Sequence, residues 1–131
     1  MKLSLFNLFL LPLAVSAFVP HHATQPMRAV VNAGPDAVVS EAVASADVIV
    51  FSKSFCPFCL KTKKLFNSLE IDYTTVELNE RDDGADIQDA LMDLTGQRTV
   101  PSVFIKGKHI GGNSDVQKAN KDGTLLKLLQ A

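Results

Sequence analysis

Two cysteines, Cys56 and Cys59, are the only thiols in the chain of 131 residues, and two residues separate them. The apolar run at residues 48–51 predicts a buried strand just before them, and Pro57 suits the first turn of a helix. Cys56 would then lie at a helix N-terminus, where unpaired N–H groups and the helix dipole favour a thiolate, and Lys53 adds positive charge nearby. Because thiolates attack disulfides, the pair predicts thiol–disulfide exchange, with Cys56 as nucleophile and Cys59 as its more buried, less reactive partner.

Three other interpretations of the cysteine pair are weaker. A structural disulfide across so short a loop would stabilise little, because the gain grows with loop length. A zinc site needs further ligands, and His109 is the only histidine in residues 36–131. Two inert core cysteines would not usually flank a proline after a strand. We therefore expect redox chemistry here and no bound metal.

The elements that must position this turn follow from hydrophobic periodicity. Strands are predicted at residues 48–51, 73–78, 102–106 and 108–110. Helices are predicted at residues 35–46, 57–69, 85–95 and 125–129, and a further helix is predicted to include Val116 and Ala119. A strand–helix–strand unit is usually right-handed and parallel, and Gly107 joins two strands closely enough for an antiparallel hairpin. The fold class is therefore α/β, with a mixed sheet flanked by helices.

The same periodicity predicts the inner faces and ends of two helices. On the helix after the cysteines, the inner residues are Leu65, Phe66 and Leu69. On the next helix they are Ile87, Ala90, Leu91 and Leu94. Asp83 is placed to cap that second helix and Gly96 to end it, while Ser114 or Asp115 is placed to cap a later one.

The first 35 residues differ from the rest in charge. They contain Lys2 and Arg28 but no acidic side chain, whereas residues 36–131 carry 11 basic and 14 acidic ones. Lys2, the apolar stretch after it and the small residues ending at Ala17 predict a signal peptide over residues 1–17; a buried helix of the mature fold is the alternative. Residues 36–131 are the predicted folded domain.

Residues 18–35 are weakly basic and interrupted by prolines, which predicts a transit peptide. The sequence Ala-Phe-Val-Pro at residues 17–20 resembles the bipartite presequences of algae with complex plastids, in which Phe follows the signal-peptide cleavage site. We therefore expect a plastid location. The alternative is a disordered linker in a protein of the secretory pathway or endoplasmic reticulum.

Composition excludes several other classes. A length of 131 residues suits one domain, and 47% hydrophobic and 21% charged residues are ordinary for a globular protein. A net charge of −1 leaves no electrostatic footprint for nucleic acid. The N-terminal apolar run is too short and interrupted to span a membrane, so no membrane association is expected once the presequence is removed.

Three separated segments resemble those of a dithiol glutaredoxin, a family of the thioredoxin-fold superfamily. They are Lys-Ser-Phe-Cys-Pro-Phe-Cys at residues 53–59, Gly-Gln-Arg-Thr-Val-Pro at residues 96–101 and Gly-Gly-Asn-Ser-Asp at residues 111–115. The likeness covers about residues 36–131 and implies a four-stranded mixed sheet flanked by about five helices. The chain departs from the family at Phe58, where Tyr is usual, and from thioredoxins in having no Trp.

The resemblance implies that glutathione is the co-substrate and identifies its contacts. Lys53 and Gln88, helped by Arg98, would bind the glycine carboxylate, and Ser114 and Asp115 the γ-glutamyl end. The remaining implied contacts are Phe58, Thr99, Val100, Pro101 and Gly112. The Val100–Pro101 bond is expected to be cis, which would turn the Val100 backbone toward the cysteinyl residue of the substrate.

Several of these side chains could instead have roles unrelated to glutathione binding. Lys53 and Arg98 could be solvated charges, Gln88 a solvated helix residue, and Asp115 only a helix cap.

The activity implied by the resemblance is glutathione-dependent reduction of protein–glutathione mixed disulfides and protein disulfides by a monomer. One alternative is a dimer that holds a [2Fe–2S] cluster with Cys56 and two glutathiones. Pro57 disfavours it, because cluster-binding relatives often have Gly there. The second alternative is an oxidant of the secretory pathway.

Overall fold

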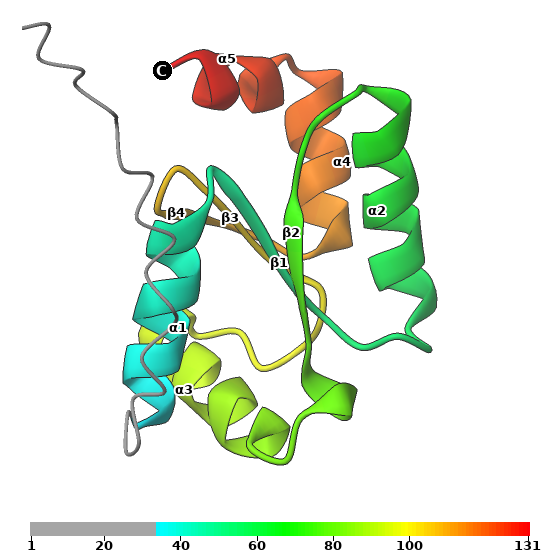
Figure 1. Cartoon of the computed structure of the whole chain (residues 1–131). Helices are drawn as coiled ribbons and strands as arrows, with labels where there is room; N and C mark the ends of the chain where they lie inside the picture. Colours follow the sequence, from blue (N-terminus) through cyan, green and yellow to red (C-terminus); the bar gives the residue numbers. More distant parts are fainter. Residues whose placement is uncertain (1–33) are drawn as a thin grey trace, which may run out of the picture. The chain divides into compact units, whose positions relative to one another are not determined.

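The structure, a computed structural model, describes residues 34–131 (Figure 1). In chain order its elements are α1 (Pro35–Ser45), β1 (Val48–Ser52), α2 (Pro57–Ser68), β2 (Thr74–Glu77), the 3-10 turn η1 (Leu78–Glu80), α3 (Gly84–Thr95), β3 (Ser102–Ile105), β4 (Lys108–Gly111), α4 (Asn113–Lys121) and α5 (Thr124–Gln130). The predicted signal peptide (residues 1–17) and nearly all of the predicted transit peptide (residues 18–35) lie outside the described residues. Among residues 34–131, no helix is long and apolar enough to cross a bilayer.

The four strands form one mixed sheet in the order β2-β1-β3-β4. Strand β1 is parallel to β2 and antiparallel to β3, and β3 pairs with β4 in the antiparallel hairpin that Gly107 predicts. All five residues of β1 are buried, because this strand is central and both faces of the sheet are covered. The predicted parallel unit, hairpin and α/β class are therefore confirmed.

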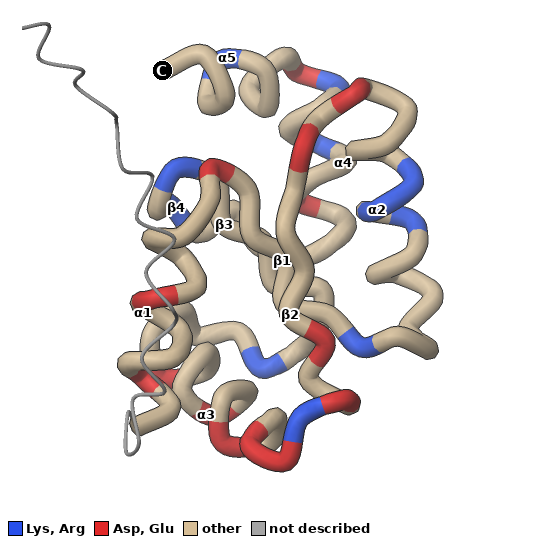
Figure 2. Tube along the Cα trace, viewed as in Figure 1, with Lys and Arg blue, Asp and Glu red and all other residues tan. Residues whose placement is uncertain are grey.

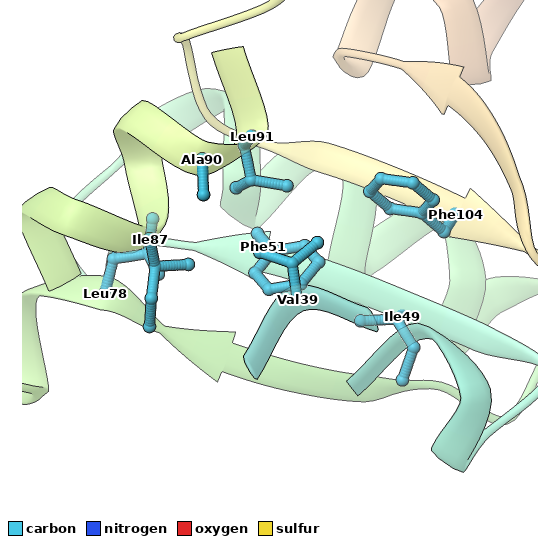
Figure 3. Packing of buried hydrophobic residues seen from close by; sticks show 8 residues of the cluster. All are labelled: Val39, Ile49, Phe51, Leu78, Ile87, Ala90, Leu91 and Phe104. Atoms are coloured by element: carbon cyan, nitrogen blue, oxygen red, sulfur yellow. The ribbon is translucent and has the colours of Figure 1, made fainter. Parts of the chain in front are cut away.

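Two hydrophobic clusters lie on opposite faces of this sheet, since alternate residues of a strand point to opposite sides. One cluster packs α1 and α3 against the sheet and contains Val39, Ile49, Phe51, Leu78, Ile87, Ala90, Leu91 and Phe104 (Figure 3). The other packs α2, α4 and α5 and contains Val48, Val50, Phe66, Val103, Ile105, Val116, Ala119 and Leu125. Residues 34–131 build a hydrophobic cluster on each face of the sheet, so we expect this part of the chain to fold on its own.

Two leucines predicted to be internal are exposed. Leu69 is 37% exposed, because α2 ends at Ser68 and the chain turns away with Glu70 at a positive φ of 57°. Leu94 is 63% exposed in the last turn of α3, where it borders a hollow of about 230 Å³ between α1 and α3. Its position on the apolar stripe is regular, but no element of residues 34–131 covers that end of the helix.

The predicted ends of three elements also need correction. Asp83 occupies the N-cap of α3 without a side-chain capping bond, because both of its carboxylate oxygens accept hydrogen bonds from Arg81 at 2.8 Å. The strand predicted over residues 73–78 is shorter, and Leu78 already belongs to η1. The N-cap position of α4 is Gly112 rather than Ser114 or Asp115, but Asp115 does cap the helix, because its side chain accepts the Gly112 N–H. Gly96 ends α3 as predicted.

Candidate active site

Cys56 is the N-cap residue of α2, in the loop that follows β1, and Pro57 occupies the first helical position. Its sulfur accepts a hydrogen bond from the Cys59 backbone N–H at 3.4 Å, and its thiol lies 3.7 Å from the Val100 carbonyl oxygen. Cys56 is partly exposed, Cys59 is buried, and both are free thiols. The thiol that an incoming disulfide can reach is therefore Cys56, at the positive end of a helix.

Burial raises the pKa of the Cys59 thiol from 9.0 to about 11, and the neighbouring Cys56 thiol contributes to this rise. Hydrogen bonds with the Lys53 backbone and the Ser52 hydroxyl oppose the pKa increase only in part. Cys59 therefore keeps its proton at neutral pH. The two sulfurs also differ in access, since Cys59 is buried and Cys56 is partly exposed.

A groove of about 490 Å³ lies beside Cys56. The two are connected through Val100, which lines the groove and whose carbonyl oxygen lies 3.7 Å from the Cys56 sulfur. The groove is lined by Phe58, Gln97, Thr99, Val100, Pro101, Gly112, Asn113, Ser114 and Asp115. The structure thus brings together the central and γ-glutamyl parts of the glutathione site implied by the sequence. Gln97 and Asn113 were not among the predicted contacts, although both lie within the motifs that carry the resemblance.

The segment between α3 and β3 forms one wall of the groove. The Val100–Pro101 bond is cis, as predicted. The Gln97 side chain holds this segment, because its Nε2 donates to the carbonyl oxygens of Thr99 and Pro101, both at 2.9 Å. The backbone on either side of Val100 is therefore fixed by a side chain from the same segment.

The opposite wall is the start of α4. The Asp115 carboxylate accepts a hydrogen bond from the Gly112 N–H at 3.0 Å, so Asp115 caps α4 from within the first turn. It also lies over Gly111, where a Cβ would come within 2.3 Å of the Asp115 Oδ2 and φ is +125°. Only glycine fits Gly111 without moving this carboxylate. Asp115 and Ser114 are both exposed to the groove side.

Three predicted contacts do not line this groove. Gln88 Nε2 donates to the Arg98 carbonyl oxygen at 2.7 Å, and the Arg98 guanidinium pairs with Asp89 at 2.7 Å, where both side chains are largely exposed. Gln88 and Arg98 therefore lie together on α3 and the segment after it. Lys53 is partly buried in the loop before Cys56, and its carbonyl oxygen accepts the Cys56 N–H at 3.0 Å.

Charge is distributed unevenly around these elements (Figure 2). Lys61, Lys63 and Lys64 lie on α2, and the Lys61 ammonium is 5.2 Å from the centre of the Phe58 ring. Acidic residues gather instead at η1 and α3. Positive charge is therefore concentrated on the helix that carries both cysteines. Among residues 34–131, no group of three or more His, Cys, Asp or Glu side chains could hold a metal ion.

Comparisons with known proteins agree with this geometry. The Glutaredoxin family model matches residues 48–110. Glutaredoxin-C6 of Oryza sativa is 53% identical over 93 residues, which cover 71% of this chain and 83% of the relative. Glutaredoxin-C4, chloroplastic, of the same species is 55% identical over 89 residues, covering 68% and 67%.

Solved structures agree as well. A buckwheat glutaredoxin–glutathione complex is 46% identical with a TM-score of 0.72, covering 73% of this chain and 87% of that chain. A wheat glutaredoxin is 54% identical with a TM-score of 0.72, covering 73% and 91%. The expected thioredoxin fold is confirmed, and residues 34–131 form its four-stranded mixed sheet and five helices.

Proposed function

The chain belongs to the glutaredoxin family of thiol–disulfide oxidoreductases, and we propose that it reduces protein–glutathione mixed disulfides and protein disulfides with glutathione as co-substrate. The observation that carries this proposal is the position of the Cys56 sulfur. It lies at the N-cap of α2, 3.7 Å from the Val100 carbonyl oxygen, at the point where the groove begins. The buckwheat relative in complex with glutathione supports the choice of co-substrate.

The reaction begins when the Cys56 thiolate attacks the glutathione sulfur of a mixed disulfide. The bond between the two substrate sulfurs breaks, the protein leaves as a thiolate, and Cys56 carries glutathione. A second glutathione thiolate then attacks the glutathione sulfur of the Cys56–glutathione disulfide and regenerates the Cys56 thiolate. The product is glutathione disulfide, so one free glutathione is consumed and the other half of the product comes from the substrate. The Cys59 N–H, 3.4 Å from the Cys56 sulfur, and the start of α2 stabilise Cys56 as both nucleophile and leaving group.

Cys59 supplies the second route. Its thiol attacks the Cys56 sulfur of the Cys56–glutathione disulfide, releases glutathione and forms the Cys56–Cys59 disulfide. The same attack on a Cys56–protein disulfide releases the reduced protein and completes dithiol reduction. Two glutathione molecules then reduce the Cys56–Cys59 disulfide and leave as one glutathione disulfide. Because burial raises the pKa of Cys59 to about 11, its proton must leave during the attack, and the departing glutathione thiolate can accept it. Cys59 is thus the resolving residue.

The groove accommodates glutathione in an orientation set by its walls. The Val100 backbone pairs with the cysteinyl residue, as one strand edge pairs with another. The first N–H groups of α4 suit the γ-glutamyl carboxylate, and Asp115 suits its ammonium. Lys53, Gln88 and Arg98 would bind the glycine carboxylate beyond the groove. A carboxylate there would compete with Asp89 for Arg98, since these two side chains are paired in the structure.

The test is a coupled assay on residues 34–131 with glutathione, glutathione reductase and a small mixed-disulfide substrate. We expect NADPH consumption that disappears in Cys56→Ser. Cys59→Ser should keep deglutathionylation and lose dithiol reduction of proteins. A flat trace from folded, reduced protein would contradict the proposal. A flat trace accompanied by visible absorption after anaerobic purification would favour the cluster-binding dimer.

We further infer that residues 1–35 direct the protein to a plastid. Their lack of acidic residues and the Phe at position 18 support this inference, and so does the chloroplastic relative from Oryza sativa. A fluorescent protein carrying residues 1–35, expressed in an alga with a complex plastid, should accumulate in that organelle. Retention in the endoplasmic reticulum, or secretion, would instead favour the secretory alternative.

A further inference from the structure

Two side chains with primary amides, Gln97 and Asn113, line the groove near Gly112. Asn113 follows Gly112 directly, and a Cβ on Gly112 would lie 3.6 Å from the Gln97 Nε2. A primary amide offers an oxygen that accepts hydrogen bonds and a nitrogen that donates two. The partners that each amide already has therefore determine which end remains for a ligand.

The oxygen of Asn113 is used inside the protein. Asn113 Oδ1 accepts hydrogen bonds from the Thr62 hydroxyl at 3.0 Å and from Gln117 Nε2 at 3.4 Å. Thr62 lies on α2 and is fully buried, so its hydroxyl needs a partner, and this bond joins the helix that carries the cysteines to the start of α4. The part of Asn113 left for the groove is its NH2 group.

Gln97 has the opposite arrangement. Both hydrogens of its Nε2 are used, one for the Thr99 carbonyl and one for the Pro101 carbonyl. Its nitrogen is therefore not available as a donor to a ligand. Of the two amides in this groove, Asn113 is the one that presents N–H groups.

We propose that the Asn113 side-chain amide donates a hydrogen bond to the α-carboxylate of the γ-glutamyl residue of glutathione. Thr62 is then a positioning residue, because its hydroxyl holds the Asn113 oxygen away from the groove and leaves the NH2 group facing it. The proposal rests on the proposed function of the groove. A hydrogen bond from an N–H group to a charged carboxylate is stronger than one to a neutral acceptor. An amide that the protein already holds in place is oriented before the ligand binds, which lowers the entropic cost of binding. Asn113 thus helps to distinguish glutathione from thiols that lack the γ-glutamyl residue.

The experiment compares two substrates that differ only in that residue. A fluorescent peptide carries either glutathione or cysteinylglycine on its single cysteine. Reduced protein comprising residues 34–131 is mixed with each in a stopped-flow instrument, and the second-order rate constant for release of the peptide thiol is measured. The ratio of the two rate constants gives the preference for the γ-glutamyl residue, and the cysteinylglycine substrate reports whether a variant is folded and reactive.

Three variants test the roles. Asn113→Asp keeps an oxygen for Thr62 but replaces the donor with an anion, and should lower the ratio of the two rate constants at least about tenfold. Thr62→Val removes only the hydroxyl and should lower the preference about threefold. The control Asn120→Asp adds the same charge on the same helix at a residue that does not line the groove, and should leave the preference unchanged.

The outcomes separate this inference from the proposed function. Wild-type protein that releases peptide thiol from neither substrate would overturn the proposed function. Wild-type protein that is active on both substrates, with a preference that survives Asn113→Asp, would overturn the role of Asn113 alone. A preference that falls in Asn113→Asp but not in Thr62→Val would overturn the positioning role of Thr62.

Discussion

Asn79 makes two hydrogen bonds to Ser54, a residue 25 positions earlier in the chain. Its Oδ1 accepts the Ser54 backbone N–H at 2.8 Å, and its Nδ2 donates to the Ser54 hydroxyl oxygen at 2.7 Å. Ser54 lies in the loop after β1, and Asn79 lies in η1 after β2. Because these strands are parallel neighbours, the segments that follow them meet at one edge of the sheet. Asn79 therefore holds the turn that presents Cys56.

Removing this pair of hydrogen bonds should slow the enzyme more than it destabilises the fold. Both side chains are exposed, so Asn79→Ala should cost only about 1 kcal/mol of unfolding free energy. A looser turn should lower kcat/KM about three- to tenfold and slow alkylation of Cys56 by iodoacetamide. Asn79→Asp should restore both rates, because its carboxylate can accept from the Ser54 N–H and hydroxyl. If iodoacetamide alkylated Cys56 in Asn79→Ala as fast as in the wild type at every pH, this role of Asn79 would be contradicted.

Stability should fall at high pH because of Cys59. Its pKa is raised from 9.0 to about 11 in the folded state, so above pH 9 the unfolded chain loses this proton first. The contribution of the buried thiol is fully present below pH 9 and is lost as the pH rises toward 11, at a cost of roughly 3 kcal/mol.

The measurement is urea unfolding of the reduced protein at pH 8 and pH 10.5, beside Cys59→Ser. Other groups titrate in both proteins, so the difference between the two pH dependences isolates Cys59. Equal pH dependences in wild type and Cys59→Ser would contradict the assignment.

A methyl group at Gly84 should destabilise the fold. A Cβ at this first residue of α3 would lie 1.8 Å from the Leu78 carbonyl oxygen, and backbone cannot move aside as a flexible side chain can. We expect Gly84→Ala to lower the unfolding free energy by about 2–4 kcal/mol in urea titrations. Gly34→Ala is the matched control, because no atom of the described residues lies within 4 Å of its Cβ position. Similar effects of the two substitutions would refute the steric argument.

The ion pair between Lys63 on α2 and Glu77 on β2 should behave as a unit. Each side chain is only 17% exposed, and the second carboxylate oxygen of Glu77 is buried with no partner among the described residues. Lys63→Met leaves a charge in this site and should cost about 3 kcal/mol of unfolding free energy. The double variant Lys63→Met/Glu77→Met should cost clearly less than the single one.

A double-mutant cycle by urea unfolding measures this coupling. Lys64→Met, at an exposed position on the same helix, should change the unfolding free energy by less than about 0.5 kcal/mol. Additive effects of the two substitutions at Lys63 and Glu77 would show that the pair contributes nothing as a pair.

Local sequence alone was enough to predict the strand and the helix around the two cysteines and the deeper burial of Cys59. The β-branched run before Cys56, Pro57 after it and the spacing to Cys59 specify a strand, a helix start and two unequal thiols within about ten residues. Such features depend on backbone preferences and on periodicity, which are properties of neighbouring residues. The family motifs added six groove residues that the structure brings together, but not Gln97 or Asn113. The six are Thr99, Val100, Pro101, Gly112, Ser114 and Asp115.

Only the tertiary structure decided which side chains meet across elements. The bond of Thr62 to Asn113 spans 51 positions, and that of Ser54 to Asn79 spans 25, so no local pattern contains either. Periodicity placed Leu94 on the apolar stripe of α3, but its side chain is 63% exposed beside the hollow that the first turns of α1 form with α3. A sequence pattern defines the face of a helix that can be buried. The partner that covers that face, and the direction in which a groove amide points, are set by packing between segments distant in the chain.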